Sequence, residues 1–300
     1  MSQYIRLALP ALVLSSLYTL LSIFLQARGM SNHYIFCHSM LTPMIMLIGM
    51  LVLKLNSIES VLSMLIVSCG ISLLVSVIMW YRDFDFLDIG LGSRLTMPLL
   101  KRTSHFWLFG MIILFNQWVS QMLVGHYMPA LDVGVFSVAQ RISFLFIGIT
   151  VAVSGVLSPK IITSIRNNDL ALLKENLKLG MWILMILGGV GLLFLINAAD
   201  FILTLFGEEF SRGRNVLVIL SIAQFLYLFS CLLSWVIIAY GFEKRLRFAA
   251  TLMLITNISL SLLLINKHGV EGASFAQLGA VTLYLILLYR ISIKAMNDIS

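Results

Sequence analysis

Residues 61–80 read VLSMLIVSCGISLLVSVIMW, twenty consecutive residues without a charged side chain. A helix of about twenty apolar residues, rising 1.5 Å per residue, crosses the hydrocarbon core of a bilayer. In that core every backbone N–H and C=O group needs a partner within the protein, and a helix provides one. The segment therefore predicts a membrane-spanning helix.

Similar apolar runs recur along the whole chain. Of its 300 residues, 60% are apolar and 11% are charged, and the mean hydropathy is +1.01. A soluble domain of this length needs more charged residues than this to cover its surface. We therefore expect the helices of this chain to be surrounded by lipid. We expect an all-α polytopic membrane protein with about nine spans, near 7–26, 35–53, 60–81, 104–124, 134–158, 178–197, 215–240, 246–266 and 270–289. The apolar piece Phe201–Phe206 is too short to cross and is expected at the interface.

The basic residues define an orientation. The net charge of +7 does not indicate a nucleic-acid partner, because the Lys and Arg residues lie in the connections between spans. Alternate connections carry fourteen and five of them, and Arg141 falls inside a span. Connections rich in Lys and Arg stay in the cytoplasm. The C-terminus is therefore expected inside and the N-terminus outside.

The longest connection, residues 82–103, divides the chain. It mixes charged and apolar residues (FDFLDIGLGSRLTMPLLKR), which is typical of an interfacial helix; a plain linker is the alternative. We expect a partial N-terminal bundle of three helices over 1–81, a cytoplasmic interfacial linker over 82–103 and a six-helix bundle over 104–300.

No catalytic arrangement can be assembled from the sequence. The five histidines are scattered, and there is no HExxH motif, no phosphate-cradling loop and no cluster with metal-ligand spacing. The connections between spans are too short to contain a globular catalytic domain. We therefore expect no enzymatic activity, no cofactor and no metal site.

Arg141 is the clearest charge within a span. In one interpretation its long side chain reaches the outer headgroups, which lowers the cost of placing a charge in the membrane. In the other it faces a central aqueous cavity and attracts an anionic group such as a diphosphate. The planar guanidinium suits that role because it binds phosphate oxygens bidentately.

The span 104–124 carries four polar residues close together. Asn116 and Ser120 share one helix face, as do Gln117 and Gln121, because residues four apart are neighbours. Polar groups in a membrane helix need partners on another helix or in cavity water. The four side chains therefore either line a cavity, where they could bind sugar hydroxyls, or hold helices together.

From about Lys101 onward, four motifs resemble one transporter family. They are LDVGVFSVAQRIS (131–143), LSPKI (157–161), LFGEEFSRGRNVLVIL (205–220) and HGVEGASFA (268–276). In this order they resemble the C-terminal half of the polysaccharide flippases in the multidrug/oligosaccharidyl-lipid/polysaccharide exporter superfamily. The first hundred residues resemble the fourth to sixth helices of that family more loosely.

The resemblance implies a fold and a function. The fold is that of the multidrug (MATE) exporters, with an N-terminal bundle lacking its first three helices. The function is translocation of undecaprenyl-diphosphate-linked oligosaccharides across the bacterial inner membrane, for O-antigen or similar polysaccharide of the cell surface. The partners implied are that lipid-linked substrate, membrane lipid, a polysaccharide polymerase and a chain-length regulator.

Two alternatives stay open at this point. The chain could be a multidrug exporter of the related branch, although a fixed arginine in the cavity repels cationic drugs. It could also be a truncated, non-transporting remnant or an assembly partner.

Overall fold

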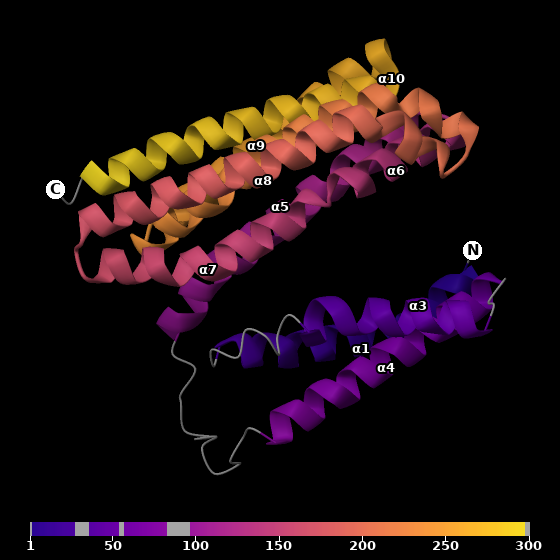
Figure 1. Ribbon diagram of the computed structural model, residues 1–300, viewed down its shortest axis with the longest axis horizontal. Helices are drawn as coiled ribbons and strands as arrows, with labels where there is room; N and C mark the ends of the chain where they lie inside the picture. The colour runs from indigo at the N-terminus through magenta and orange to yellow at the C-terminus, as the bar shows by residue number, and fades with distance from the viewer. Residues whose placement is uncertain (1, 28–35, 54–56, 83–96, 298–300) are drawn as a thin grey trace. The chain divides into compact units, whose positions relative to one another are not determined.

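The computed structural model describes residues 2–27, 36–53, 57–82 and 97–297, and within these ranges it contains helices and no strand. The chain forms two compact units, Met1–Arg94 and Leu95–Ser300. The ribbon in Figure 1 labels the helices of both units. Each unit is described by itself below.

The N-terminal unit packs through small side chains. It consists of α1 (Ser2–Ala27), the π-helical turn η1 (Phe36–Met40), α3 (Leu41–Leu53) and α4 (Ile58–Arg82). The buried residues of α4 are small: Ser68, Cys69, Ser72 and Ser76. They allow neighbouring helices to approach closely, as is usual between membrane helices. The hydroxyls of Thr42 and Ser72 lie 2.8 Å apart and join α3 to α4.

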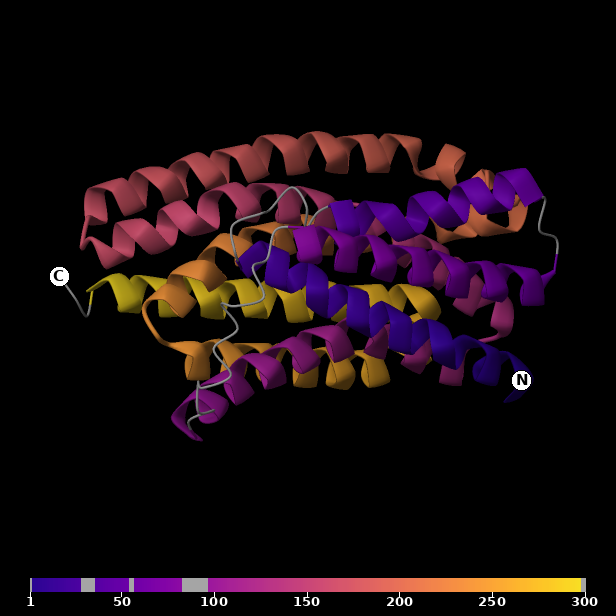
Figure 2. The ribbon, with the colours of Figure 1, turned by 90° about the horizontal axis from the view of Figure 1, so that it is seen from below.

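The C-terminal unit is built around α9. Its elements are α5 (Met97–Tyr127), α6 (Ala130–Ser143), α7 (Phe146–Arg166), α8 (Leu170–Thr204), the 3₁₀ turn η3 (Glu208–Gly213), α9 (Arg214–Ala239) and α10 (Glu243–Asn297). Helix α9 packs against α6, α7, α8 and α10 and buries thirteen residues. Figures 1 and 2 both show α7 and α8 side by side, joined by the turn at 167–169. A central helix buried on most sides has to be apolar all round.

Helix α10 is interrupted and folds back on itself. Gly269 has φ 57° and ψ −136°, which is not helical and strongly favours glycine. Leu246 from the first half and Leu288 from the second lie in the same hydrophobic cluster, so the halves run antiparallel. They correspond to the expected spans 246–266 and 270–289.

One expectation about the spans holds and another is wrong. The expected span 134–158 lies within one apolar helical stretch, Ala130–Arg166, that is long enough to cross, and a short turn at 144–145 divides this stretch into α6 and α7. The break leaves Leu145 68% exposed. The piece Phe201–Phe206 is not a separate interfacial element, because α8 continues to Thr204. A polar Asn197 and Asp200 precede this piece, but helix propensity and packing carry the helix through them.

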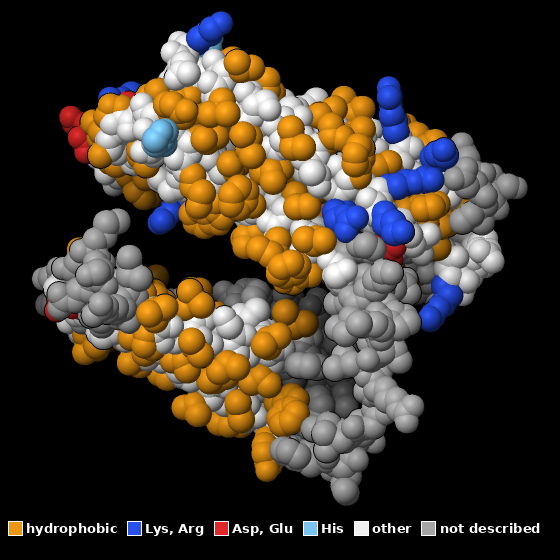
Figure 3. Space-filling model, turned by 180° about the vertical axis from the view of Figure 1, so that it is seen from behind, with side chains coloured by type: hydrophobic (Ala, Val, Ile, Leu, Met, Phe, Trp, Pro, Cys, Tyr) orange, Lys and Arg blue, Asp and Glu red, His pale blue; other side chains and the backbone are white. Residues whose placement is uncertain are grey.

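The helices are long and apolar enough for a membrane protein. Within the described residues six helices qualify as spans, and 8–23 and 41–53 form two shorter apolar helices. Because α10 counts once among the six but folds back at Gly269, the arrangement confirms an all-α polytopic fold of about nine segments. Large apolar side chains cover much of the exposed surface (Figure 3). Such a surface is stable in lipid and would aggregate in water.

The expected interfacial helix lies mostly outside the described residues. Residues 83–96 are not described, and the remainder of that segment, from Met97, belongs to α5. The linker therefore stays a prediction.

Candidate functional site

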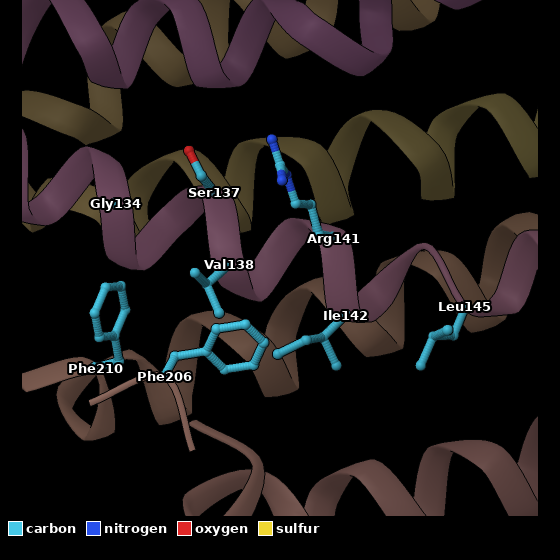
Figure 4. Close-up of a pocket in the computed structure, with 8 residues that line it drawn as sticks. All are labelled: Gly134, Ser137, Val138, Arg141, Ile142, Leu145, Phe206 and Phe210. Atoms are coloured by element: carbon cyan, nitrogen blue, oxygen red, sulfur yellow. The ribbon is translucent and has the colours of Figure 1, made fainter. Parts of the chain in front are cut away.

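A cavity of about 530 Å³ lies along α6 in the C-terminal unit. Its lining comes from α6, from the α6–α7 break and from the segment between α8 and α9: Gly134, Ser137, Val138, Arg141, Ile142, Leu145, Phe206 and Phe210. Figure 4 shows these side chains around α6. The volume is in the range of pockets that bind small molecules.

The cavity has a polar rim and an apolar rim. Ser137 and Arg141, four residues apart, project from one side of α6 (Figure 4). Val138 and Ile142 project from the other side, towards Phe206, and Leu145 lies in the break after α6. This separation follows from the helical repeat, because residues three and four apart lie on one face. An amphipathic molecule with an anionic group would therefore match both rims.

Arg141 carries a charge that no carboxylate neutralises. Among the described residues, Arg212 pairs with Asp132 and Arg214 with Asp200, both at 2.9 Å, but no carboxylate pairs with Arg141. Its side chain is exposed to the cavity. A cationic group left without a counter-ion in an apolar surrounding attracts an anionic ligand strongly, because the local dielectric is low.

Gln140, next to Arg141, has a different role. Its side chain is buried, and Nε2 donates to the backbone carbonyl of Gln117 at 2.8 Å. The two neighbours diverge because successive residues on a helix are about 100° apart. The Gln140 hydrogen bond holds α6 against α5. Of these two neighbouring residues, only Arg141 faces the cavity.

The segment between α8 and α9 holds the two phenylalanines in place. Gly207 has φ 133°, a conformation that favours glycine, and it turns the chain between Phe206 and Phe210. The ion pair between Arg212 and Asp132 then fastens η3 to the first turn of α6. This partly exposed pair contributes little to stability by itself, but it joins the segment that carries Phe206 and Phe210 to the helix that carries Arg141.

Asn116 and Ser120 lie in a buried hydrogen-bond network. Asn257 of α10 donates from Nδ2 to Asn116 Oδ1 at 3.1 Å and accepts from Ser120 Oγ at 3.2 Å. Ser261 also donates to Asn257 Oδ1, at 3.3 Å. All four residues are buried. For this helix face the geometry favours the interhelix role over the lining of a cavity.

The other face of α5 points to α6. Gln121 Nε2 donates to Ser137 Oγ at 2.9 Å, and Ser137 lines the cavity beside Arg141. Gln117 is partly buried and contributes its backbone carbonyl to Gln140. Of the five residues singled out in the sequence, the structure therefore brings Gln121 to the Arg141 rim and directs Asn116 and Ser120 elsewhere.

Sequence reasoning missed most residues of these two sites, and four of them show why. Ser137 precedes Arg141 by one helical turn, and that spacing could have identified it. Asn257 is an amide in the middle of an apolar span, which indicates a need for a partner. Phe206 and Phe210 carry no such signal, because aromatic residues are common throughout membrane proteins.

Replacing Asn257 by leucine is expected to lower the free energy of unfolding by about 1–2 kcal/mol, because it leaves Asn116 and Ser120 without their partner. Thermal unfolding of the purified protein in detergent measures the loss. Asn266→Leu is the matched control, since Asn266 is exposed and bonds only the carbonyl of Leu262 in its own helix. An Asn257→Leu protein that unfolds at the same temperature as the parent would contradict the structural role of the network.

The site has the chemistry of binding. Within the described part of the chain, no group of three His, Cys, Asp or Glu side chains is placed to hold a metal ion. The groups present are one cation, hydroxyl and amide donors, and apolar walls. They can hold an amphipathic anion without breaking bonds in it.

The fold is shared with membrane transporters of known structure. The outward-facing conformation of a multidrug resistance MATE family transporter of the MOP superfamily superposes with a TM-score of 0.77, over 99% of this chain and 70% of that one, at 13% identity. The inward closed conformation of the lipid II flippase MurJ gives a TM-score of 0.65, over 90% of this chain and 61% of that one, at 17% identity. At these identities the likeness establishes the fold.

Sequence comparison identifies relatives. The probable flippase AglR of Haloferax volcanii is 29% identical over 207 residues, which are 68% of this chain and 43% of AglR. The chain thus spans less than half the length of this relative. The family described as polysaccharide biosynthesis protein matches residues 1–213, which include the candidate cavity. This chain therefore belongs to the polysaccharide biosynthesis protein family, in agreement with the resemblance noted in its sequence.

Proposed function

We propose that this protein is a flippase that moves undecaprenyl-diphosphate-linked oligosaccharides across the bacterial inner membrane, for O-antigen or similar surface polysaccharide. The observation that carries the proposal is the uncompensated Arg141 on the polar rim of a cavity whose opposite rim is apolar. The substrate has the same division, with a diphosphate and sugars at one end and a hydrocarbon chain at the other. Membership of the family and the likeness to a probable flippase support the same class of activity.

Each cavity residue has a distinct task in this proposal. Arg141 binds the diphosphate, since its guanidinium forms two parallel hydrogen bonds to phosphate oxygens. Gln121 and Ser137, already joined to each other at 2.9 Å, exchange that bond for bonds to sugar hydroxyls. Gln117, on the same face of α5 as Gln121, is a further candidate for sugar contact. No bond of the substrate is broken, so the protein acts as a carrier and not as an enzyme.

Movement across the membrane would come from two helical bundles. We assign residues 1–81 to the first bundle, 82–103 to the linker and 104–300 to the second. In alternating access, bundles rock about a binding site near the bilayer midplane. The polar headgroup crosses within the cavity, and the lipid chain stays in the bilayer.

The basic residues support an orientation for this movement. Arg166 lies in the last turn of α7, Lys174 near the beginning of α8, Lys244 in the first turn of α10 and Lys294 in its last turn. On the face of the C-terminal unit shown in Figure 3, the largest group of basic side chains also lies towards one end. We place this end, and the C-terminus, in the cytoplasm. A polysaccharide polymerase and a chain-length regulator would then receive the substrate on the outer side.

Deletion of the gene in its host tests the proposal. We expect loss of the surface polysaccharide and accumulation of lipid-linked repeat units inside the cell, both restored when this chain is supplied. Polysaccharide is measured by gel electrophoresis of surface extracts, and repeat units by mass spectrometry of lipid extracts. The Arg141→Gln protein, expressed at the same level, is the matched negative control.

Other outcomes would favour other functions. Unchanged polysaccharide together with greater susceptibility to cationic drugs would favour a multidrug exporter. Unchanged polysaccharide together with co-purification of polysaccharide-assembly enzymes would favour a non-transporting assembly partner.

A further inference from the structure

A second, smaller cavity of about 100 Å³ adjoins the first. It lies between the beginning of α7 and the middle of α8, and its lining is entirely apolar: Leu145, Phe146, Ile149, Gly191, Phe194 and Leu195. Leu145 lines both cavities. The two spaces are therefore neighbours that meet at the α6–α7 break.

The break joins the second cavity to the apolar rim of the first. Val138 and Ile142 lie on the side of α6 that faces away from Arg141, and Leu145 follows them in the break after α6 (Figure 4). Leu145 also lines the second cavity. A path of apolar side chains thus leads from the cationic site to an apolar groove.

Two features keep the groove open. Gly191 lacks a side chain, and a Cβ built on it would lie 3.6 Å from the ring of Phe146 on the opposite wall. The groove is accessible from outside because Leu145 and Phe194 on its rims are 68% and 62% exposed. Phe146 and Leu195, which also line it, are both buried. A larger residue at position 191 would close the groove without a clash between backbones.

We infer that this groove, defined by the six residues that line the second cavity, binds the part of the isoprenoid chain next to the diphosphate that Arg141 holds, while the rest of the chain stays in the bilayer. This inference rests on the proposed function and extends it to the lipid part of the substrate. The argument for this occupant is complementarity: one molecule with a phosphate head and a hydrocarbon tail fills a cationic cavity and the apolar groove next to it. Burial of its tail adds affinity roughly in proportion to the apolar area removed from water.

Binding of prenyl diphosphates to the purified full chain in detergent tests the inference. Dimethylallyl diphosphate probes the head site, and geranylgeranyl diphosphate probes the head site and the groove. Long prenyl chains also partition into detergent micelles, which lowers their free concentration. For this reason the dissociation constant of each probe is compared between protein variants, and not with that of the other probe. Dissociation constants are measured by native mass spectrometry.

Gly191→Leu fills the groove and is expected to weaken binding of geranylgeranyl diphosphate about tenfold, while binding of dimethylallyl diphosphate is unchanged. Gly189→Leu is the matched control on the same helix, because a Cβ at Gly189 meets nothing within 4 Å; it is expected to bind both probes as the parent does. Phe194→Ser removes a wall at an exposed position and provides a second test if Gly191→Leu does not fold.

The outcomes separate the inference from the proposed function. Arg141→Gln should weaken both probes, and unchanged binding of both would overturn the diphosphate role of Arg141. If Arg141→Gln weakens both probes but Gly191→Leu and Phe194→Ser bind geranylgeranyl diphosphate as the parent does, the groove inference alone is overturned. Displacement of this probe by an equal concentration of phosphatidylglycerol would also overturn it, because the groove would then be a general phospholipid site.

Discussion

Replacing Arg141 by alanine is expected to abolish delivery of polysaccharide to the cell surface while the protein remains folded and present at its normal level. The side chain is exposed to the cavity and pairs with none of the described carboxylates, so its removal breaks no ion pair within the described part of the chain. It does remove the cation that binds the diphosphate. Loss of one partner of a close charge pair costs about 2–5 kcal/mol, and each 1.4 kcal/mol corresponds to about a tenfold change in affinity.

The measurement is complementation of the deletion strain with variants of matched expression. Arg214→Ala is the control: Arg214 is also an arginine of the C-terminal unit, but it pairs with Asp200 on the exposed surface at 2.9 Å. Exposed pairs of this kind contribute about 0–1 kcal/mol, so this variant should restore the polysaccharide. Normal polysaccharide in the Arg141→Ala strain would exclude Arg141 from substrate binding and favour an arginine that extends towards the lipid headgroups.

Lysine at position 141 distinguishes a bidentate contact from a simple charge. Lysine keeps the positive charge but lacks the planar fork that donates two parallel hydrogen bonds. Partial activity of Arg141→Lys is expected, between those of the parent and the alanine variant. Full activity would contradict the bidentate role and leave only an electrostatic one.

The spans were predictable because the membrane imposes a local requirement. A run such as residues 61–80 has to form a helix inside the membrane, because lipid supplies no hydrogen bonds to the backbone. This requirement does not depend on which helices pack beside it. The helix α4 over Ile58–Arg82 confirms this prediction. The turn at Gly269 was equally accessible, because the polar residues Asn266 to His268 and a glycine separate two apolar runs there.

The break between α6 and α7 was not predictable in the same way. It falls on Phe144 and Leu145 and contains neither proline nor glycine. The signals that mark helix ends in a sequence are therefore missing. Residues of α6 and α7 on both sides of the break pack into one hydrophobic core with α8 and α9, and a single sequence does not reveal that packing. The candidate cavity and the adjoining groove both depend on this break.

The polar residues of α5 show the same limit. The spacing correctly separated Asn116 and Ser120 from Gln117 and Gln121, since helix geometry alone decides which residues share a face. The sequence does not show which helix the Asn116 face contacts. The partner of Asn116 is Asn257, which lies far along the chain in α10. Pairing between helices that are distant in sequence needs a three-dimensional arrangement.

Replacing Gly272 by alanine is expected to cause the largest loss of stability among the glycine-to-alanine substitutions in the helices of the C-terminal unit. Gly272 lies just after the turn at Gly269, and a Cβ there would overlap the carbonyl group of Leu264 and approach the backbone nitrogen of Ile265 to 2.9 Å. Overpacking usually costs about 1–3 kcal/mol. We expect about 3 kcal/mol or more here, because the obstacle is backbone and cannot rotate away.

A graded series of glycines provides the controls. Gly155→Ala in α7 meets nothing within 4 Å and should be neutral or slightly stabilising, because alanine favours the helix. Gly279→Ala meets only the side-chain tip Leu260 Cδ1 at 3.1 Å, which can shift, and should fall between the two. Midpoints of thermal unfolding in detergent are expected in the order Gly155→Ala, Gly279→Ala, Gly272→Ala, from highest to lowest.

The reason for so large an effect is that Leu264 cannot give way alone. Its carbonyl belongs to the first half of α10, which also carries Asn257 in its network with α5. The second half carries Tyr284, whose ring stacks on Tyr227 of α9 at 6.2 Å. Separating the two halves to admit a methyl group would loosen both contacts at once. A Gly272→Ala protein with the same unfolding midpoint as the Gly155→Ala control would contradict this expectation. The two halves of α10 would then separate without disturbing these two contacts, and the close approach at Gly272 would contribute little to the fold.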